Sequence, residues 1–149
     1  NKRLEKLGRV FKKSVRELGL DLNKVCVLDP EASATLTSSD AKEFDYFVFG
    51  GILGDYPPRK RTKKELTRFL PGFAVRDIGK KQMATDNAVY VVNEICKGKK
   101  LEDLKFRDKF ILKINEIEST ELPYRYVVVN GKQLVSDEVI NYLKRKKGF

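Results

Sequence analysis

The feature that most constrains the fold is a set of short apolar runs in which polar residues do not alternate. Residues 46–49 are Tyr-Phe-Val-Phe and end at a pair of glycines, and residues 25–28 are Val-Cys-Val-Leu followed by Asp-Pro. Continuous apolar strands are typical of parallel sheets covered on both faces, because successive side chains point to opposite faces. Parallel strands also need crossover connections, usually helices. These runs therefore predict an α/β fold.

The segments between the runs supply the expected crossovers. Apolar residues at spacings of three and four predict an amphipathic helix over 3–18 and another from about 85 to 96, with Thr85 or Asp86 as its N-cap. Further expected elements are a short helical turn after the loop 31–40, a helix over 62–69, strands over 73–75, 110–114 and 124–129, a turn at Asn130-Gly131, and a last helix capped by Ser136. Strands alternating with helices predict a mostly parallel sheet flanked by helices, in one domain over 1–149.

Two counts exclude whole classes of chemistry. The chain has no histidine, so it has no Ser-His-Asp triad, histidine base or histidine metal ligand. Its cysteines, Cys26 and Cys96, do not form a Cys-x-x-Cys pair, so a structural zinc site lacks ligands and no metal is expected. Reduced thiols without a disulfide predict a cytoplasmic protein. No apolar run approaches the roughly 20 residues of a membrane span, so no membrane partner is expected.

The charge balance indicates a polyanionic partner. Lysine and arginine number 31 against 21 acidic residues, a net charge of +10. Such an excess favours RNA or a ribosome as neighbour. A heat-adapted surface is an equal and compatible explanation, because the chain has one methionine, few glutamines and abundant Lys and Glu.

Three segments that follow predicted strands are candidates for a ligand site, because ligands of open α/β sheets bind beyond the carboxyl ends of the strands. They are residues 50–55, 76–83 and 121–124. The first holds three glycines but matches neither the Walker nor the G-x-G-x-x-G spacing, and a plain turn is an equal alternative. The second leads into a helix N-terminus, whose amides suit a polar or anionic group. Helix capping alone also explains Thr85 and Asp86.

Several of these residues together carry a resemblance to a known family: residues 44–55 (Phe-Asp-Tyr-Phe-Val-Phe-Gly-Gly-Ile-Leu-Gly-Asp), Pro57-Pro58-Arg59, Arg61-Thr62, Gln82-Met83, Thr85-Asp86 and Ala88. The chain resembles the SPOUT-class (α/β-knot) methyltransferases, in the group of ribosomal-protein arginine methyltransferases of fungi and their archaeal relatives. The resemblance runs from Val25 to Val127. It implies S-adenosylmethionine (SAM) as cofactor and a C-terminal trefoil knot, a rare exception to the rule against threaded chains. It also implies an N-terminal strand and helix that this chain lacks before Asn1.

The resemblance also implies roles for particular residues. The cofactor-binding residues would be Phe49, Gly50, Gly51, Leu53, Gly54, Ile78, Gly79, Gln82, Met83, Thr85 and Ala88. We expect Asp55 and Glu121 to be the catalytic carboxylates, and Arg59, Arg61 and Asp86 to contact the substrate. Arg76 and Arg125 would each touch the cofactor carboxylate or form a structural ion pair.

The expected function is transfer of a methyl group from SAM to an arginine side chain of a ribosomal protein. One alternative is a SPOUT RNA methyltransferase acting on rRNA or tRNA, which the net charge favours. Many RNA-modifying members have an arginine near the position of Ala84, and this chain lacks it. The fungal His-Pro-Pro-Arg-Asp-Arg is Tyr-Pro-Pro-Arg-Lys-Arg over 56–61, so the acceptor need not be the fungal one. A second alternative is a basic ribosome-binding protein without enzymatic activity. Monomer and homodimer are both open.

Overall fold

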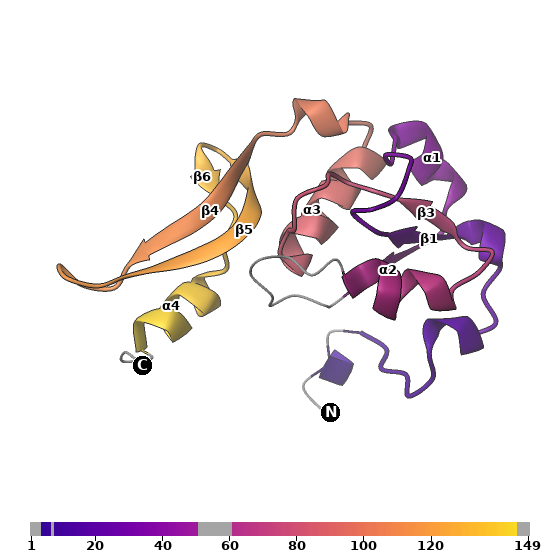
Figure 1. Ribbon diagram of the computed structural model, residues 1–149, viewed down its shortest axis with the longest axis horizontal. Helices are drawn as coiled ribbons and strands as arrows, with labels where there is room; N and C mark the ends of the chain where they lie inside the picture. The colour runs from indigo at the N-terminus through magenta and orange to yellow at the C-terminus, as the bar shows by residue number, and fades with distance from the viewer. Residues whose placement is uncertain (1–3, 7, 51–60, 146–149) are drawn as a thin grey trace.

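The computed structural model describes residues 4–6, 8–50 and 61–145. Within these ranges the first sheet has three parallel strands, β1 (Val25–Leu28), β2 (Tyr46–Phe49) and β3 (Ala74–Arg76), in the order β2-β1-β3 (Figure 1). Cys26 of β1 is in register with Phe47 of β2 and Ala74 of β3. The predicted α/β fold with a parallel sheet is confirmed for this part of the chain.

The two predicted apolar strands differ in burial. All four residues of the central strand β1 are buried, as its continuous apolar run predicts. In β2 the prediction of burial on both faces is wrong, because β2 lies at the edge of the sheet and Tyr46 is 49% exposed. An edge strand has a neighbour on one side, so it is covered less than a central strand.

Helices α1 (Ser38–Glu43), α2 (Arg61–Glu65) and α3 (Thr85–Cys96) accompany this sheet, and a 3₁₀ turn, η4 (Thr67–Phe69), follows α2. Helix α3 has the predicted bounds, and its Val91, Val92 and Ile95 are buried in a core cluster with β1. The predicted N-cap is wrong. Ala84 is the N-cap and makes no side-chain bond, whereas Asp86 Oδ1 accepts the N–H of Asn87 at 2.8 Å.

The helix predicted over 3–18 is wrong for the described residues of that segment. They contain only 3₁₀ turns, η1 (Leu4–Lys6) and η2 (Val15–Glu17), followed by η3 (Leu22–Lys24) before β1. Val10 and Phe11, which belong to that part of the chain, are 49% and 57% exposed. An amphipathic helix takes most of its stability from packing its apolar face, and these side chains are not packed.

The other strands form a second, antiparallel sheet: β4 (Phe106–Lys113), β5 (Ser119–Val129) and β6 (Lys132–Gln133), in the order β4-β5-β6. The strands predicted over 110–114 and 124–129 therefore exist but do not extend the parallel sheet. Asn130 and Gly131 make the predicted turn with φ of 50° and 79°, as a two-residue hairpin requires. Ser136 Oγ accepts the N–H of Glu138 at 3.2 Å at the start of α4 (Asp137–Arg145), as predicted.

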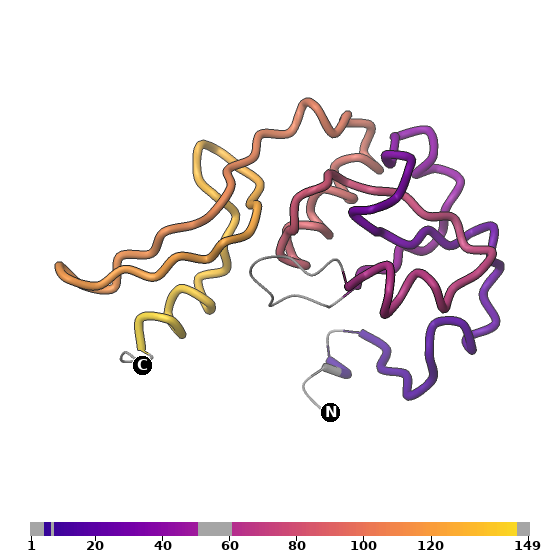
Figure 2. Tube along the Cα trace, viewed as in Figure 1, coloured from indigo at the N-terminus to yellow at the C-terminus, as the bar shows by residue number. Residues whose placement is uncertain are grey.

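The two sheets meet at α3 and the loop before it. Figure 2 shows the chain leaving α3 and reaching the hairpin through residues 97–105, which include the 3₁₀ turn η5 (Leu101–Asp103). The N–H of Arg125 in β5 donates to the carbonyl of Gln82 at 2.9 Å, and Val127 joins the core cluster of α3. No helix in the described ranges has both the length and the apolar character needed to cross a bilayer.

Candidate functional site

A cavity of about 1000 Å³ lies between the two sheets, at the carboxyl ends of the parallel strands. Its parallel-sheet wall contains Leu28 and Phe49, the last residues of β1 and β2, and Ile78, which follows β3. The opposite wall comes from the antiparallel hairpin, including Asp108 of β4 and Arg125 of β5. The position agrees with the rule that places ligands beyond strand carboxyl ends.

The cavity brings together most of the predicted site residues that the structure describes. Lining it are Phe49, Gly50, Arg61, Ile78, Gly79, Gln82, Met83, Thr85, Ala88 and Glu121. Asp86 does not line it, and its carboxylate bonds to the backbone and side-chain nitrogens of Asn87. Arg61 also pairs with Glu65, at 2.6 Å. Gly51, Leu53, Gly54, Asp55 and Arg59 lie outside the described residues.

The loop after β3 is fixed by a buried carboxylate. Asp77 is 3% exposed, and its Oδ1 accepts the N–H of Gly79 at 2.9 Å. Its Oδ2 accepts from Lys80 Nζ at 2.7 Å, and Thr35 Oγ1 donates to the same carboxylate. Gly79 has a φ of +110°, which L side chains rarely adopt. Gly79 and Asp77 together fix the backbone path of the loop after β3, which forms part of the cavity wall.

Asp29 is a cavity residue for which the sequence predicted only a turn. It directly follows β1, is 2% exposed and lines the cavity. Its Oδ1 accepts the N–H of Glu31 at 2.9 Å and its Oδ2 accepts from Thr67 Oγ1 at 2.6 Å. Its position at the end of a buried strand was the available signal, because strand ends were the expected site.

The hairpin wall carries a charged cluster that joins Arg125 and Lys81, both in or beside the predicted site segments, through Asp108, which was not predicted. Arg125 Nε donates to Asp108 Oδ1 at 2.8 Å, and Lys81 Nζ pairs with Asp108 Oδ2. The two cations lower the pKa of Asp108 to about 2. A Cβ on Gly79 would lie 4.0 Å from Arg125 Nη1, so the Arg125 guanidinium lies close to the glycine at the cavity wall. Asp108 therefore connects β4, β5 and the loop after β3.

Glu121, one of the expected catalytic carboxylates, lies on the same hairpin wall. Lys109 Nζ donates to its Oε2 at 3.0 Å, and the two side chains are 56% and 45% exposed. Both residues line the cavity. A carboxylate held by one partly exposed lysine remains accessible to another cation.

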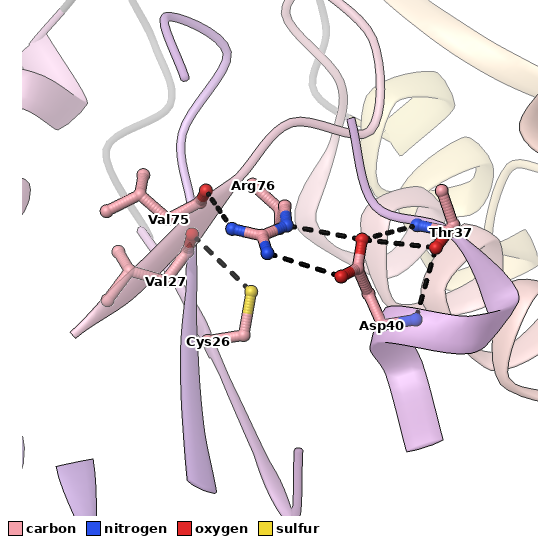
Figure 3. A network of polar contacts seen from close by, with 6 residues as sticks. All are labelled: Cys26, Val27, Thr37, Asp40, Val75 and Arg76. Carbon is pink, nitrogen blue, oxygen red and sulfur yellow. Dashed lines mark hydrogen bonds and ion pairs between the residues drawn. The ribbon is translucent and has the colours of Figure 1, made fainter. Parts of the chain in front are cut away.

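Arg76 and Arg125, each expected either to contact the cofactor or to form a structural ion pair, differ in the structure. Arg76 does not line the cavity; Figure 3 shows its guanidinium held by Asp40, with two contacts of 3.2 Å. This pair lowers the pKa of Asp40, whose carboxylate also accepts from Thr37. Burial raises the pKa of the neighbouring Cys26 thiol to about 11, so that cysteine is an inert core residue. Arg125 both forms an ion pair and faces the cavity.

No group of three metal-ligating side chains occurs among residues 4–6, 8–50 and 61–145. The polar groups that line the cavity are carboxylates, ammonium and guanidinium groups, amides and hydroxyls. Such groups can orient an organic ligand and a charged acceptor.

Three comparisons relate this chain to known proteins. The family model described as "Protein arginine N-methyltransferase SFM1-like" matches residues 2–148. The protein arginine N-methyltransferase SFM1 of Saccharomyces cerevisiae is 44% identical over 124 residues, which are 82% of this chain. The match covers 58% of the yeast protein, so this chain corresponds to little more than half of its length.

Solved structures agree with the sequence match. The crystal structure of yeast SFM1 complexed with SAM is 40% identical, with a TM-score of 0.86 over 97% of this chain and 70% of that one. A structure described as a novel protein arginine methyltransferase is 39% identical, with a TM-score of 0.80 over 99% of this chain and 78% of that one. By sequence and by fold, this chain belongs to the SFM1-like family of protein arginine N-methyltransferases.

Proposed function

We propose that this protein is a SAM-dependent methyltransferase that modifies an arginine side chain. The cavity carries the proposal, because described residues from each of the three segments that the family resemblance assigns to the cofactor line it. Yeast SFM1, which has the same fold, has been solved in complex with SAM, SAH and MTA. Family membership supports a protein arginine as the acceptor.

The residues present fit SAM. Ligand cavities commonly measure about 300–1000 Å³, so this one has room for the cofactor and for part of an acceptor side chain. Leu28, Ile78 and Met83 offer apolar surface for a flat base. Thr85, in the first turn of α3, supplies a hydroxyl beside backbone amides that suit a polar group.

The carboxylates of the hairpin wall suit an arginine acceptor. An arginine side chain has a pKa above about 12, so removing its proton fully at pH 7 would cost roughly 7 kcal/mol. When bound, SAM would supply an electrophilic methyl group from its sulfonium sulfur, and the broken sulfur–methyl bond would leave S-adenosylhomocysteine (SAH). We infer that Glu121 binds the guanidinium, orients one nitrogen toward the cofactor and accepts the proton as the new carbon–nitrogen bond forms. Asp55, the other predicted carboxylate, lies outside the described residues.

The finer parts of the proposal come from the resemblance. They are a ribosomal protein as acceptor, a cytoplasmic location, the SPOUT class and a C-terminal knot that includes the cofactor loops. An RNA acceptor has the basic composition of the chain in its favour, with a net charge of +10, whereas the related proteins named above are protein arginine methyltransferases.

Two measurements test the proposal in order. Calorimetric titration with SAM should give saturable binding in the micromolar range or tighter. Transfer of a labelled methyl group is then measured separately into a purified ribosomal-protein fraction and into rRNA. Label in an arginine of a protein supports the proposal, whereas label in rRNA supports the RNA alternative instead. A folded protein that does not bind SAM overturns both.

A further inference from the structure

The hairpin that forms one wall of the cavity is interrupted at the cavity itself. Asp108 is in register with Arg125, and Phe110 is in register with Leu122. Lys109 alone therefore stands between the paired positions of β4, whereas Pro123 and Tyr124 stand between those of β5. This is a β-bulge, and proline is common at bulges because it has no N–H to donate. Lys109, Pro123 and Tyr124 all line the cavity.

The bulge gives Lys109 an unusual backbone conformation. Its φ is 61°, in the left-handed region that non-glycine residues seldom adopt. Gln133 Nε2 donates to the carbonyl of Lys109 at 2.9 Å and so holds this conformation from β6, which pairs with the other side of β5. Bulges re-aim side chains, and backbone outliers are concentrated at functional sites. The side chain re-aimed here ends at Glu121, 3.0 Å from its Oε2.

Asp108 and Glu121, the two carboxylates of the hairpin wall, differ in how many of their oxygens already have a bonding partner. Asp108 uses one oxygen for Arg125 and the other for Lys81. Glu121 uses only Oε2, for Lys109, within the part of the chain that the structure describes. A guanidinium binds a carboxylate best through two parallel hydrogen bonds, which need both oxygens. Glu121 can offer both once Lys109 has moved away, whereas Asp108 would have to give up two partners.

We propose that the Lys109 ammonium group is an internal stand-in for the acceptor arginine, which must displace it from Glu121 to be methylated. The inference rests on the function proposed above and adds a specificity-determining residue to it. An arginine with two parallel donors displaces a lysine with a single contact, whereas an acceptor lysine has no such advantage. Lys109 acts through Glu121 and is a positioning residue.

The test compares Lys109→Met with the wild-type chain. Methionine keeps an unbranched stem at the same backbone position and removes the charge. With the ribosomal-protein fraction as acceptor, the apparent KM for acceptor should fall by about 2- to 5-fold, the range expected for one partly exposed ion pair. The kcat and the Kd for SAM should stay within about 2-fold. Lys109→Arg, which can hold both oxygens of Glu121, should raise the KM for acceptor instead.

Two further variants show whether the effect passes through Glu121. Because Glu121→Gln is expected to lose methyl transfer, this background is tested by binding: Lys109→Met should no longer change the Kd for the acceptor protein there, whereas with Glu121 present it should lower that Kd. Lys113→Met removes the same charge from an exposed position of β4 away from the cavity and should leave the KM unchanged. An unchanged or raised KM in Lys109→Met, with active wild-type enzyme, overturns this inference and leaves the proposed function intact. SAM binding without transfer to protein by any variant overturns both.

Discussion

The side-chain oxygen of Asn87 accepts the backbone N–H of Val127 at 2.9 Å. Asn87 lies in the first turn of α3 and is fully buried, and Val127 lies on β5 of the second sheet. The amide nitrogen of Asn87 donates to the carbonyl of Leu134 at 2.9 Å. One side chain thus joins the helix that packs on the parallel sheet to strand β5 and to the residue that follows β6.

Removing this amide should destabilise the protein. Asn87→Ala leaves the Val127 N–H and the Leu134 carbonyl without their partner, and each unsatisfied buried group costs about 1–3 kcal/mol. We expect the free energy of unfolding to fall by roughly 2–4 kcal/mol in urea denaturation. Asn93→Ala, at an exposed position of the same helix, is the control and should change it by less than about 0.5 kcal/mol. Equal effects of the two variants would contradict this role of Asn87.

The Asp108 cluster predicts an acid-sensitive contribution to stability. Its folded pKa, about 2, lies below the ordinary 3.8 because of Arg125 and Lys81. A carboxylate with a lowered pKa contributes stability that is fully present above pH 3.8 and is lost as the pH falls toward 2. The side chain is 49% exposed, so screening limits the contribution to about 1 kcal/mol or less.

Asp108→Asn should therefore flatten the decline in unfolding free energy between pH 4 and pH 2. Equilibrium urea unfolding at several pH values measures this slope. A variant whose slope matches that of the wild-type chain would show that the Arg125 and Lys81 contacts do not favour the charged carboxylate.

Filling the cavity from α3 should weaken SAM binding. Ala88 lines the cavity, so Ala88→Phe places a ring in the space assigned to the cofactor. Overpacking of this kind costs about 1–3 kcal/mol, and a tenfold or larger rise in the Kd for SAM is expected by calorimetry. Val89→Phe adds a ring at the next position, which is 47% exposed and outside the cavity, and should leave the Kd unchanged. Unaltered SAM affinity in a folded Ala88→Phe variant would show that the cofactor does not bind in this cavity.

Two glycines with similar backbone angles form a matched pair. Gly79, on the cavity wall, has a φ of +110°, and Gly98, after α3, has a φ of +102°. Alanine at either position is strained, with an expected loss of about 1–3 kcal/mol in stability. Only Gly79→Ala should also weaken SAM binding, by about 5-fold or more, because its loop forms part of the wall. A similar loss of SAM affinity in Gly98→Ala would mean that destabilisation alone explains the effect.

The sequence predicts the parallel sheet well because its signals are local. The apolar run 25–28, the helix at Thr85–Cys96 and the Asn130-Gly131 turn appear in the structure as expected. The helix predicted over 3–18 fails because periodicity shows that a helix could bury one face and does not show what would cover it. The antiparallel pairing of β4 with β5 is also beyond local pattern, since the period of a strand does not specify its neighbour.

The residues of the candidate site likewise fall into those that the sequence predicts and those that it does not. Residues next to strand ends, such as Phe49 and Ile78, are found from sequence because strand ends collect ligands. Asp108 and Lys109 lie within a strand and were not predicted to be part of the site. They reach the cavity through cross-strand register and a bulge, which depend on residues far along the chain. Pro123 was a local hint of that bulge.

The division of the cavity between two sheets has an evolutionary consequence. The proposed cofactor contacts come mainly from the parallel half, and the charges that we propose to face the acceptor come from β4 and β5. Substitutions on the hairpin can therefore change which side chain is accepted while the walls around SAM stay intact. A fold arranged in this way can acquire new acceptors by exchanging a few surface charges, without rebuilding its core.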